Sequence, residues 1–200
     1  TTSPVMSAEL HCRGCSPAQV FVLPCCLSAS QEETAMAVPL PVVEEGEPMR
    51  VLFIGRLDSY KRLDWLLMSL AAMRSPWRLS VVGDGPNRSR FEQLVQQLFS
   101  SQLQADPELV VFHGRLPELE KQKQIAHSEV LVLPSDRSNE AFGIVQLEAM
   151  AAGRIALAFD RPRSGMGWVG KLSGLPWSQS PEGLSEVLQR LADRPALRQR

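Results

Sequence analysis

The chain has 200 residues, and its 21 Lys plus Arg residues against 22 Asp plus Glu residues give a formal net charge of −1. This balance excludes a dedicated nucleic-acid-binding protein, because recognition of a phosphate backbone ordinarily needs a basic excess. No apolar run approaches the roughly 18–20 residues of a membrane-spanning helix, which excludes a transmembrane segment. The sequence begins at Thr1 without Met and without a charged-then-apolar leader, so we expect no signal peptide and a chain cut from a longer protein.

The first 48 residues differ in composition from the rest of the chain. A mixed polar and apolar stretch over residues 7–19 leads into a strand-like apolar run at residues 20–23, which Pro24 closes. Residues 28–48 are rich in Glu and Pro and show no clear hydrophobic period, which predicts a loop or linker.

Four cysteines lie in this first part, as a C-x-x-C pair (Cys12 and Cys15) and as the adjacent Cys25 and Cys26. A zinc site would need a second pair at ligand spacing, and adjacent side chains on an extended strand point to opposite faces. A catalytic dithiol would need a βαβ pattern around the C-x-x-C, which is absent. We therefore interpret the cysteines as free thiols in a reducing compartment, and their role stays open.

From Arg50 onward, apolar runs alternate with segments of helical periodicity. The predicted strands cover residues 51–54, 79–82, 109–112, 130–133 and 155–159. The predicted helices cover residues 63–71, 91–98, 117–128, 143–152 and 184–191. This alternation predicts an α/β fold, a Rossmann-like doubly wound parallel sheet with helices on both faces. Ligands of such sheets bind outside the carboxyl ends of the strands, so the loops after the strands should carry the function.

The loop after the first strand carries two cations, Arg56 and Lys61, near the start of a helix. Cations at a helix N-terminus are unfavourable unless an anion sits between them, so they indicate either a phosphate site or side chains that solvate the helix. The next loop has Gly83-Asp84-Gly85, which permits a tight turn but lacks the third glycine of a dinucleotide fingerprint. No P-loop motif occurs, which excludes a P-loop NTPase.

The loop after the fourth strand is the most informative. Phe142 and Gly143 open the predicted helix, so the N–H groups of residues 142–145 should face a pyrophosphate. Glu148 lies on the apolar stripe of that helix, where an unpaired carboxylate is costly. Either a ribose diol or a buried Arg would satisfy it.

The string E-A-F-G-I-V-Q-L-E-A-M-A-A-G resembles the Glu–seven residues–Glu motif of the family 4 glycosyltransferases. The segments V-L-F-I-G-R-L-D-S-Y-K-R, V-V-G-D-G-P, F-H-G-R-L and V-L-V-L-P-S resemble others of that family in order and spacing, and S-G-L-P-W at residues 173–177 resembles a late one. The resemblance covers about residues 18 to 200. It implies the GT-B fold, in which two Rossmann-like domains face each other and the C-terminal one binds the nucleotide-sugar donor.

The resemblance also implies roles for individual residues. Arg56 and Lys61 would bind the donor diphosphate and stabilise the leaving group, Glu140 would contact the transferred sugar, and Glu148 would hold the ribose. Backbone groups of residues 142–144 would meet phosphate or sugar, and residues 114–116 would lie against the base. The implied catalytic residues are Arg56, Lys61 and Glu140; the implied donor-binding residues are Gly55, Gly83, Gly114, Arg115, Leu116, Phe142, Gly143, Ile144, Val145 and Glu148.

By the same resemblance, the protein would transfer a sugar from a nucleoside-diphosphate sugar, with retention, to a saccharide or lipid-linked saccharide in cell-surface polysaccharide synthesis. No metal and no cofactor are expected. Residues 1–24 would be a remnant of the N-terminal domain with the interdomain strand, residues 25–49 a linker, and residues 50–200 the donor domain. We expect a cytoplasmic protein, and the full-length enzyme could associate peripherally with the inner face of the membrane. We expect this chain to be inactive by itself. A non-catalytic nucleotide-sugar-binding module and another GT-B enzyme, such as a nucleotide-sugar epimerase, stay open as alternatives.

The sequence departs from the family pattern in the loop at residues 160–169. Its S-G-M-G-W-V string resembles a variant in bacterial cell-surface polysaccharide glycosyltransferases, and Arg161 and Arg163 there are either sugar contacts or solvated charges. His113 and His127 are each isolated from other candidate groups, so we interpret both as structural.

Overall fold

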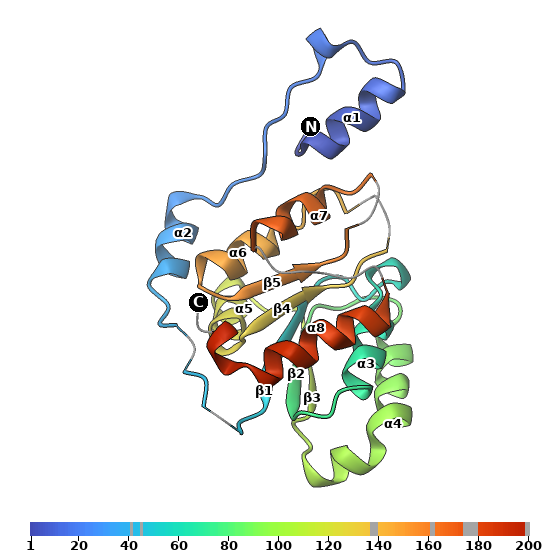
Figure 1. The fold of residues 1–200 in the computed structure, drawn as a ribbon, viewed down its shortest axis with the longest axis vertical. Coiled ribbons are helices and arrows are strands. Elements are labelled where there is room, and N and C mark those ends of the chain that lie inside the picture. Colours follow the sequence, from blue (N-terminus) through green and yellow to red (C-terminus); the bar gives the residue numbers. More distant parts are fainter. Residues whose placement is uncertain (41, 45, 137–139, 161–162, 174–179, 199–200) are drawn as a thin grey trace.

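The computed structural model describes residues 1–40, 42–44, 46–136, 140–160, 163–173 and 180–198. Five parallel strands form one sheet in the order β3-β2-β1-β4-β5 (Figure 1). The strands are β1 (Met49–Ile54), β2 (Trp77–Val82), β3 (Val110–Gly114), β4 (Val130–Leu133) and β5 (Ile155–Ala158). The predicted doubly wound parallel sheet is confirmed, and the strand order reverses between β1 and β4, the place where such sheets bind ligands.

Helices cover both faces of the sheet (Figure 1). One face packs against α3 (Leu63–Ala71), α4 (Arg88–Ala105) and α8 (Pro181–Asp193). The other packs against α2 (Ala29–Met36), α5 (Glu118–His127) and α6 (Val145–Ala151). Successive residues of β1 alternate between the two cores, with Phe53 on the first face and Leu52 on the second, and both are fully buried. A strand that is buried on both faces has a continuous run of apolar residues, which is why these strands could be predicted from the sequence.

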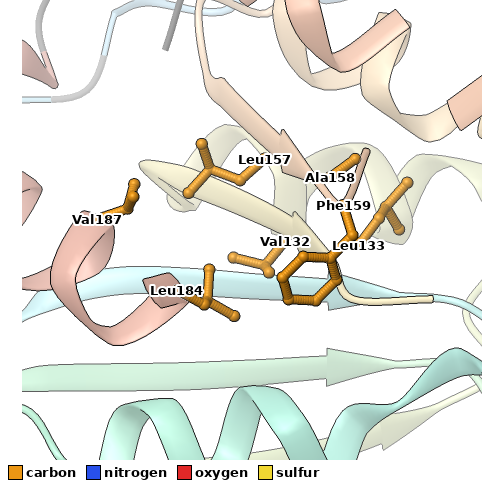
Figure 2. Close-up of a pocket in the computed structure, with 7 residues that line it drawn as sticks. All are labelled: Val132, Leu133, Leu157, Ala158, Phe159, Leu184 and Val187. Atoms are coloured by element: carbon orange, nitrogen blue, oxygen red, sulfur yellow. The ribbon is translucent and has the colours of Figure 1, made fainter. Parts of the chain in front are cut away.

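Apolar side chains from β4, β5 and α8 converge beside the carboxyl ends of β4 and β5. Figure 2 shows Val132, Leu157 and Leu184 pointing into this space, where every side-chain atom is carbon. The void they leave is about 10 Å³, no more than the volume of one water-sized sphere. It is part of the packed core, and none of the residues that line it has a polar side chain.

The N-terminal part is more structured than its composition predicts. Helix α1 (Pro4–Cys12) begins after the cap Ser3, and α2 lies inside the predicted loop. Ser28 and Gln31 form a capping box at the start of α2, a sequence signal that the prediction missed. The expected strand at residues 20–23 was wrong: this segment is extended but joins no sheet strand. Leu23 is 75% exposed, and its N–H bonds only the carbonyl of Thr1.

Several other boundaries also differ from the prediction; α4, for example, covers Arg88–Ala105 where residues 91–98 were expected. Helix α6 begins at Val145, two residues later than expected, because Gly143 has φ +73° and cannot continue a right-handed helix. Helix α7 (Gly165–Gly170) replaces part of the predicted loop at residues 160–169, and the hydroxyl of Ser164 caps it by accepting from the N–H of Met166. The short 3₁₀ turns are Pro17–Gln19, Ser59–Lys61, Lys171–Ser173 and Pro195–Leu197. In the described part of the chain, no helix has both the length and the apolar character to span a membrane.

Candidate functional site

An open cleft of about 370 Å³ lies at the carboxyl ends of β1, β2 and β3. Three of the residues that line it are cationic, Arg56, Arg115 and Lys121, against the single carboxylate of Asp84. The lining residues are Ile54, Gly55, Arg56, Val82, Gly83, Asp84, Arg115, Leu116 and Lys121. The excess of positive charge suits an anionic ligand.

Glycine backbone forms part of this wall because two strand ends approach closely. A Cβ atom on Gly83 would lie 2.0 Å from the carbonyl oxygen of Gly55, and Gly83 has φ +126°. The N–H of Gly83 donates to the carbonyl of Gly114 at 2.7 Å, which ties β2 to β3 at the edge of the cleft. Only glycine fits at residue 83, because the backbone of Gly55 fills the space that a side chain would need.

Arg56 enters the cleft from the loop after β1. Its side chain is 64% exposed, and its Nε lies 3.5 Å from Oδ2 of Asp58, a weak and solvated pair. Arg115 is exposed on the loop after β3, and Leu116 beside it is half-buried. Both cations can therefore turn toward an anion without breaking a buried contact.

Lys61 and Glu140 meet across the switch point of the sheet. Lys61 ends the 3₁₀ turn after β1, and its Nζ donates to Oε2 of Glu140 from the connection after β4. The two side chains are 13% and 17% exposed. The structure thus brings together two of the three residues that were expected to be catalytic, and Glu140 neutralises the charge of Lys61.

Glu148 on α6 is 4% exposed and pairs with a cation. A buried Arg was one of its two expected partners, but the cation in the structure is Lys121. The Nζ atom of Lys121 lies 3.0 Å from Oε1 of Glu148 and 3.0 Å from Oε2 of Glu118. Burial opposes the charge of Lys121, but the hydrogen bonds to Glu148 and Glu118 outweigh it and raise the lysine pKa above its usual value. Lys121 was not among the site residues predicted from the sequence. It lies four residues before the fully buried Ile125, and this spacing places it on the inward face of α5.

Buried side chains hold the connection between β4 and α6 in place. Phe142 is buried and packs against Trp168 with ring centroids 6.2 Å apart. Gln146, fully buried, donates from Nε2 to the carbonyls of Phe142 and Met166, each at 3.1 Å. Gln146 was also missed by the sequence reading, and it holds the backbone at residues 142–145 in place.

The expected site residues therefore fall into two neighbouring groups. Gly55, Arg56, Gly83, Arg115 and Leu116 line the cleft, whereas Glu148 lies behind Lys121. Residues 142–144 and Glu140 belong to the connection after β4, Val145 begins α6, and Lys61 joins this connection to the loop of Arg56. Gly114 supports the cleft through its carbonyl and does not line it.

Other candidate residues lie apart from these groups. Arg163 pairs with Glu9 of α1 at 3.0 Å, while Arg161 and residues 174–177 of the S-G-L-P-W segment lie outside the described residues. The four cysteines are free thiols. Across the described ranges, no group of three or more His, Cys, Asp and Glu side chains could hold a metal ion.

Two curated relatives are both glycosyltransferases by name. An uncharacterised glycosyltransferase of Methanocaldococcus jannaschii is 35% identical over 113 residues, which are 56% of this chain and 27% of that protein. The lipopolysaccharide 1,6-galactosyltransferase of Escherichia coli K12 is 32% identical over 125 residues, 60% of this chain and 33% of that protein. The chain thus matches only about a quarter to a third of the length of these relatives.

Solved structures share the fold. Sucrose-phosphate synthase of Thermosynechococcus elongatus superimposes with a TM-score of 0.72 at 24% identity, over 100% of this chain and 50% of that one. Anabaena HepE in complex with UDP and glucose gives a TM-score of 0.64 at 15% identity, over 96% of this chain and 52% of that one.

The sequence also matches the family described as "Glycosyl transferases group 1" over residues 48–193, which include the whole sheet and both groups of site residues. The chain therefore belongs to the glycosyl transferases group 1 family.

Proposed function

We propose that this chain binds the nucleoside-diphosphate sugar donor of a retaining family 4 glycosyltransferase with the GT-B fold. The observation that carries the proposal is the cationic cleft at the carboxyl ends of β1–β3, next to the Lys61–Glu140 pair at the switch point. The UDP and glucose bound to HepE, a protein of the same fold, support this ligand class.

In this proposal Arg56 and Lys61 neutralise the donor diphosphate. Arg56 is free to turn toward the phosphates, and Lys61 exchanges the carboxylate of Glu140 for a phosphate oxygen. The released Glu140 then accepts a hydrogen bond from a hydroxyl of the transferred sugar. Ligand binding replaces the ion pair of Lys61 with Glu140 by an ion pair of Lys61 with the phosphate. The ammonium group of Lys61, which is largely shielded from water, is therefore never left without a counter-charge.

The reaction that follows is sugar transfer with retained anomeric configuration. The bond between the anomeric carbon and the diphosphate oxygen breaks through an oxocarbenium-like transition state, and the acceptor oxygen bonds to that carbon while its proton passes to the departing phosphate. Negative charge develops on the leaving diphosphate, where Arg56 and Lys61 stabilise it through preorganised contacts.

We infer that residues 50–200 are the donor domain, residues 25–49 a linker that includes α2, and residues 1–24 the end of an acceptor-side domain. The saccharide or lipid-linked acceptor would bind to the rest of the protein, and this chain alone would transfer nothing. The name of the Escherichia coli relative supports a role in cell-surface polysaccharide synthesis. Such a protein would work in the cytoplasm, with the full-length enzyme able to associate with the inner face of the membrane.

Calorimetric titration of the chain with UDP, GDP and ADP tests donor binding. One of the three should bind with a Kd below about 1 mM, which corresponds to about −4 kcal/mol. Lys61→Ala should weaken that ligand at least tenfold, while Lys123→Ala, which removes an exposed lysine of α5, should leave it unchanged. Absence of binding by all three nucleotides at millimolar concentration would overturn the proposal.

Turnover of the full-length protein separates the alternatives. Donor binding without transfer would indicate a nucleotide-sugar-binding module, and conversion of the donor without any acceptor would indicate an epimerase. A glycosyltransferase should form product only with an acceptor and should lose turnover in Lys61→Ala.

A further inference from the structure

Arg62 directly follows Lys61 and has a left-handed backbone conformation, with φ +51° and ψ +42°. Residues with a side chain disfavour this region, because the Cβ atom lies too close to the following carbonyl oxygen. Outside glycine, Arg163 is the only other described residue with a positive φ. A residue keeps such a conformation only where its surroundings fix it, and such residues cluster at functional sites. The contacts that fix Arg62 therefore bear on the function of the neighbouring Lys61.

Three contacts hold the guanidinium group of Arg62. Its Nε donates to Oδ1 of Asp64 at 2.9 Å, and its Nη1 donates to Oδ2 of Asp136 at 2.9 Å. Its face lies over the ring of Trp65, with 3.8 Å between Cζ and the ring centroid. The planar fork of an arginine suits two carboxylates and an aromatic face at once. The side chain is 25% exposed, so Arg62 is committed to these partners, unlike the more exposed Arg56.

The contact with Asp136 links two segments of the candidate site. Asp136 lies on the connection after β4, four residues before Glu140, and Arg62 lies on the loop after β1. The Arg62–Asp136 pair thus joins the same two segments as the Lys61–Glu140 pair. The backbone joins them as well, because the N–H of Asp136 donates to the carbonyl of Tyr60 at 3.0 Å. The loop is therefore held against the connection on both sides of Lys61.

The two aspartates differ in what they connect. Asp64 lies on the first turn of α3, two residues after Arg62, so this ion pair stays within one segment. Asp136 is 74 residues away in the sequence, so its ion pair is the one that ties the two segments together. The side chains of Asp64 and Asp136 are 18% and 24% exposed, so water screens the two pairs to a similar extent. Asp64 therefore provides a matched control for Asp136.

We propose that Arg62 and Asp136 are positioning residues, whose ion pair fixes the loop after β1 so that the ammonium group of Lys61 is preorganised for a phosphate group of the donor. This inference rests on the proposed function. The guanidinium group of Arg62 is occupied by its partners and lines a depression apart from the cationic cleft, so it acts through Lys61 and not on the ligand. A lysine side chain is flexible, and a fixed loop reduces the conformational freedom that is lost when the lysine binds a phosphate.

The test measures nucleotide affinity by calorimetry, with whichever of UDP, GDP and ADP the wild-type chain binds most tightly. Asp136→Ala should weaken binding about fivefold, the cost of ordering one long side chain on binding. Electrostatics alone predicts the opposite sign, because removal of a carboxylate near an anion strengthens the binding of that anion. Asp64→Ala removes the same charge but keeps the two segments joined, and it should bind at least as tightly as the wild type. Asp136→Glu keeps the carboxylate and should retain most of the affinity.

A double-mutant cycle shows whether the ion pair acts through Lys61. Asp136→Ala should weaken binding in the wild-type background but cause no further loss in the Lys61→Ala background, where ligand-detected NMR titration measures the weaker affinities. A merely structural residue, or one that contacts the nucleotide itself, would show the same loss in both backgrounds. Arg62→Gly is a second variant, which loses the ion pair but suits the left-handed backbone, and it should follow the same pattern.

Thermal unfolding confirms that each variant is folded before titration. Equal losses in the two backgrounds would overturn the inference, and so would wild-type affinity in folded Asp136→Ala and Arg62→Gly. In both cases the proposed function stands, because the wild type still binds the nucleotide. Absence of binding by the wild-type chain would overturn the inference and the proposed function together.

Discussion

Lys61 and Glu140 form an ion pair across the switch point of the sheet, although 79 residues separate them in the sequence. The loops after β1 and β4 carry them, and these two strands are neighbours in the sheet where its order reverses. The pair joins the cationic cleft to the connection that leads into α6, so a change in either residue should affect both stability and ligand binding.

A charge swap separates these two roles. Lys61→Glu and Glu140→Lys each place like charges together and should destabilise the fold by about 1–2 kcal/mol, because the pair is largely shielded from water. The double variant restores the attraction and should recover most of that stability in urea unfolding, without recovering nucleotide affinity. Recovery of affinity in the double variant would show that the position of the lysine is unimportant.

Gly83→Ala should be strongly destabilising. The added Cβ would lie 2.0 Å from the carbonyl oxygen of Gly55, and the φ of +126° is strained for any other residue. We expect a loss of more than about 2 kcal/mol in the free energy of unfolding. Gly46→Ala is the matched control, because Gly46 has φ +90° with open space around it and should lose only about 1 kcal/mol.

Glu129 is a buried carboxylate held by two arginines. It is 1% exposed and pairs with Arg198, itself 2% exposed, and with Arg50 at 3.2 Å. Glu129→Ala leaves the buried Arg198 without its counter-charge, and we expect a loss of about 3–5 kcal/mol in urea unfolding. Glu120→Ala, which breaks an exposed pair on α5, should cost no more than about 1 kcal/mol, and equal losses in the two variants would contradict the role of burial.

His113 should make stability fall in mild acid. Burial lowers the pKa of this histidine, whose Nε2 lies 3.3 Å from the hydroxyl of Ser80. In the unfolded chain this histidine has a pKa of about 6.5 and therefore binds a proton more tightly than in the folded protein. The free energy of unfolding is thus unaffected by His113 above that pH and falls as the pH drops below it. The Tm of the wild type should drop between pH 7.5 and pH 5.5 by more than the Tm of His113→Gln, and identical drops would contradict the prediction.

Hydrophobic patterns along the chain were sufficient to predict the strands and helices that form the core of the fold. The strand at Val130–Leu133 was predicted at its observed boundaries, because its four residues are buried on both faces and apolar without interruption. The amphipathic period of α3 likewise marked Leu63–Ala71. Helix α2 was missed because its hydrophobic face is narrow: only Ala35 is buried, and the Glu-rich remainder resembles a linker.

The start of α6 shows a different limit of the sequence. The motif from Glu140 to Glu148 was found, but the positive φ of Gly143 delays the helix to Val145. That angle depends on how closely the connection packs, since a side chain there would meet Gln146 and Leu133 at about 3 Å. Packing with distant residues is not encoded in any local pattern.

By itself, the sequence determined that the chain is an α/β domain with a parallel sheet and that its candidate site lies in the loops after the strands. Burial forces apolar periodicity on these elements, and periodicity can be read along the chain. Only the tertiary structure decided the strand order, the pairing of Lys61 with Glu140 and the placement of Lys121 over Glu148. The physical reason is that a charged side chain shows in the sequence that it needs a partner but not which one, and the partners here come from elements that only the folded sheet brings together.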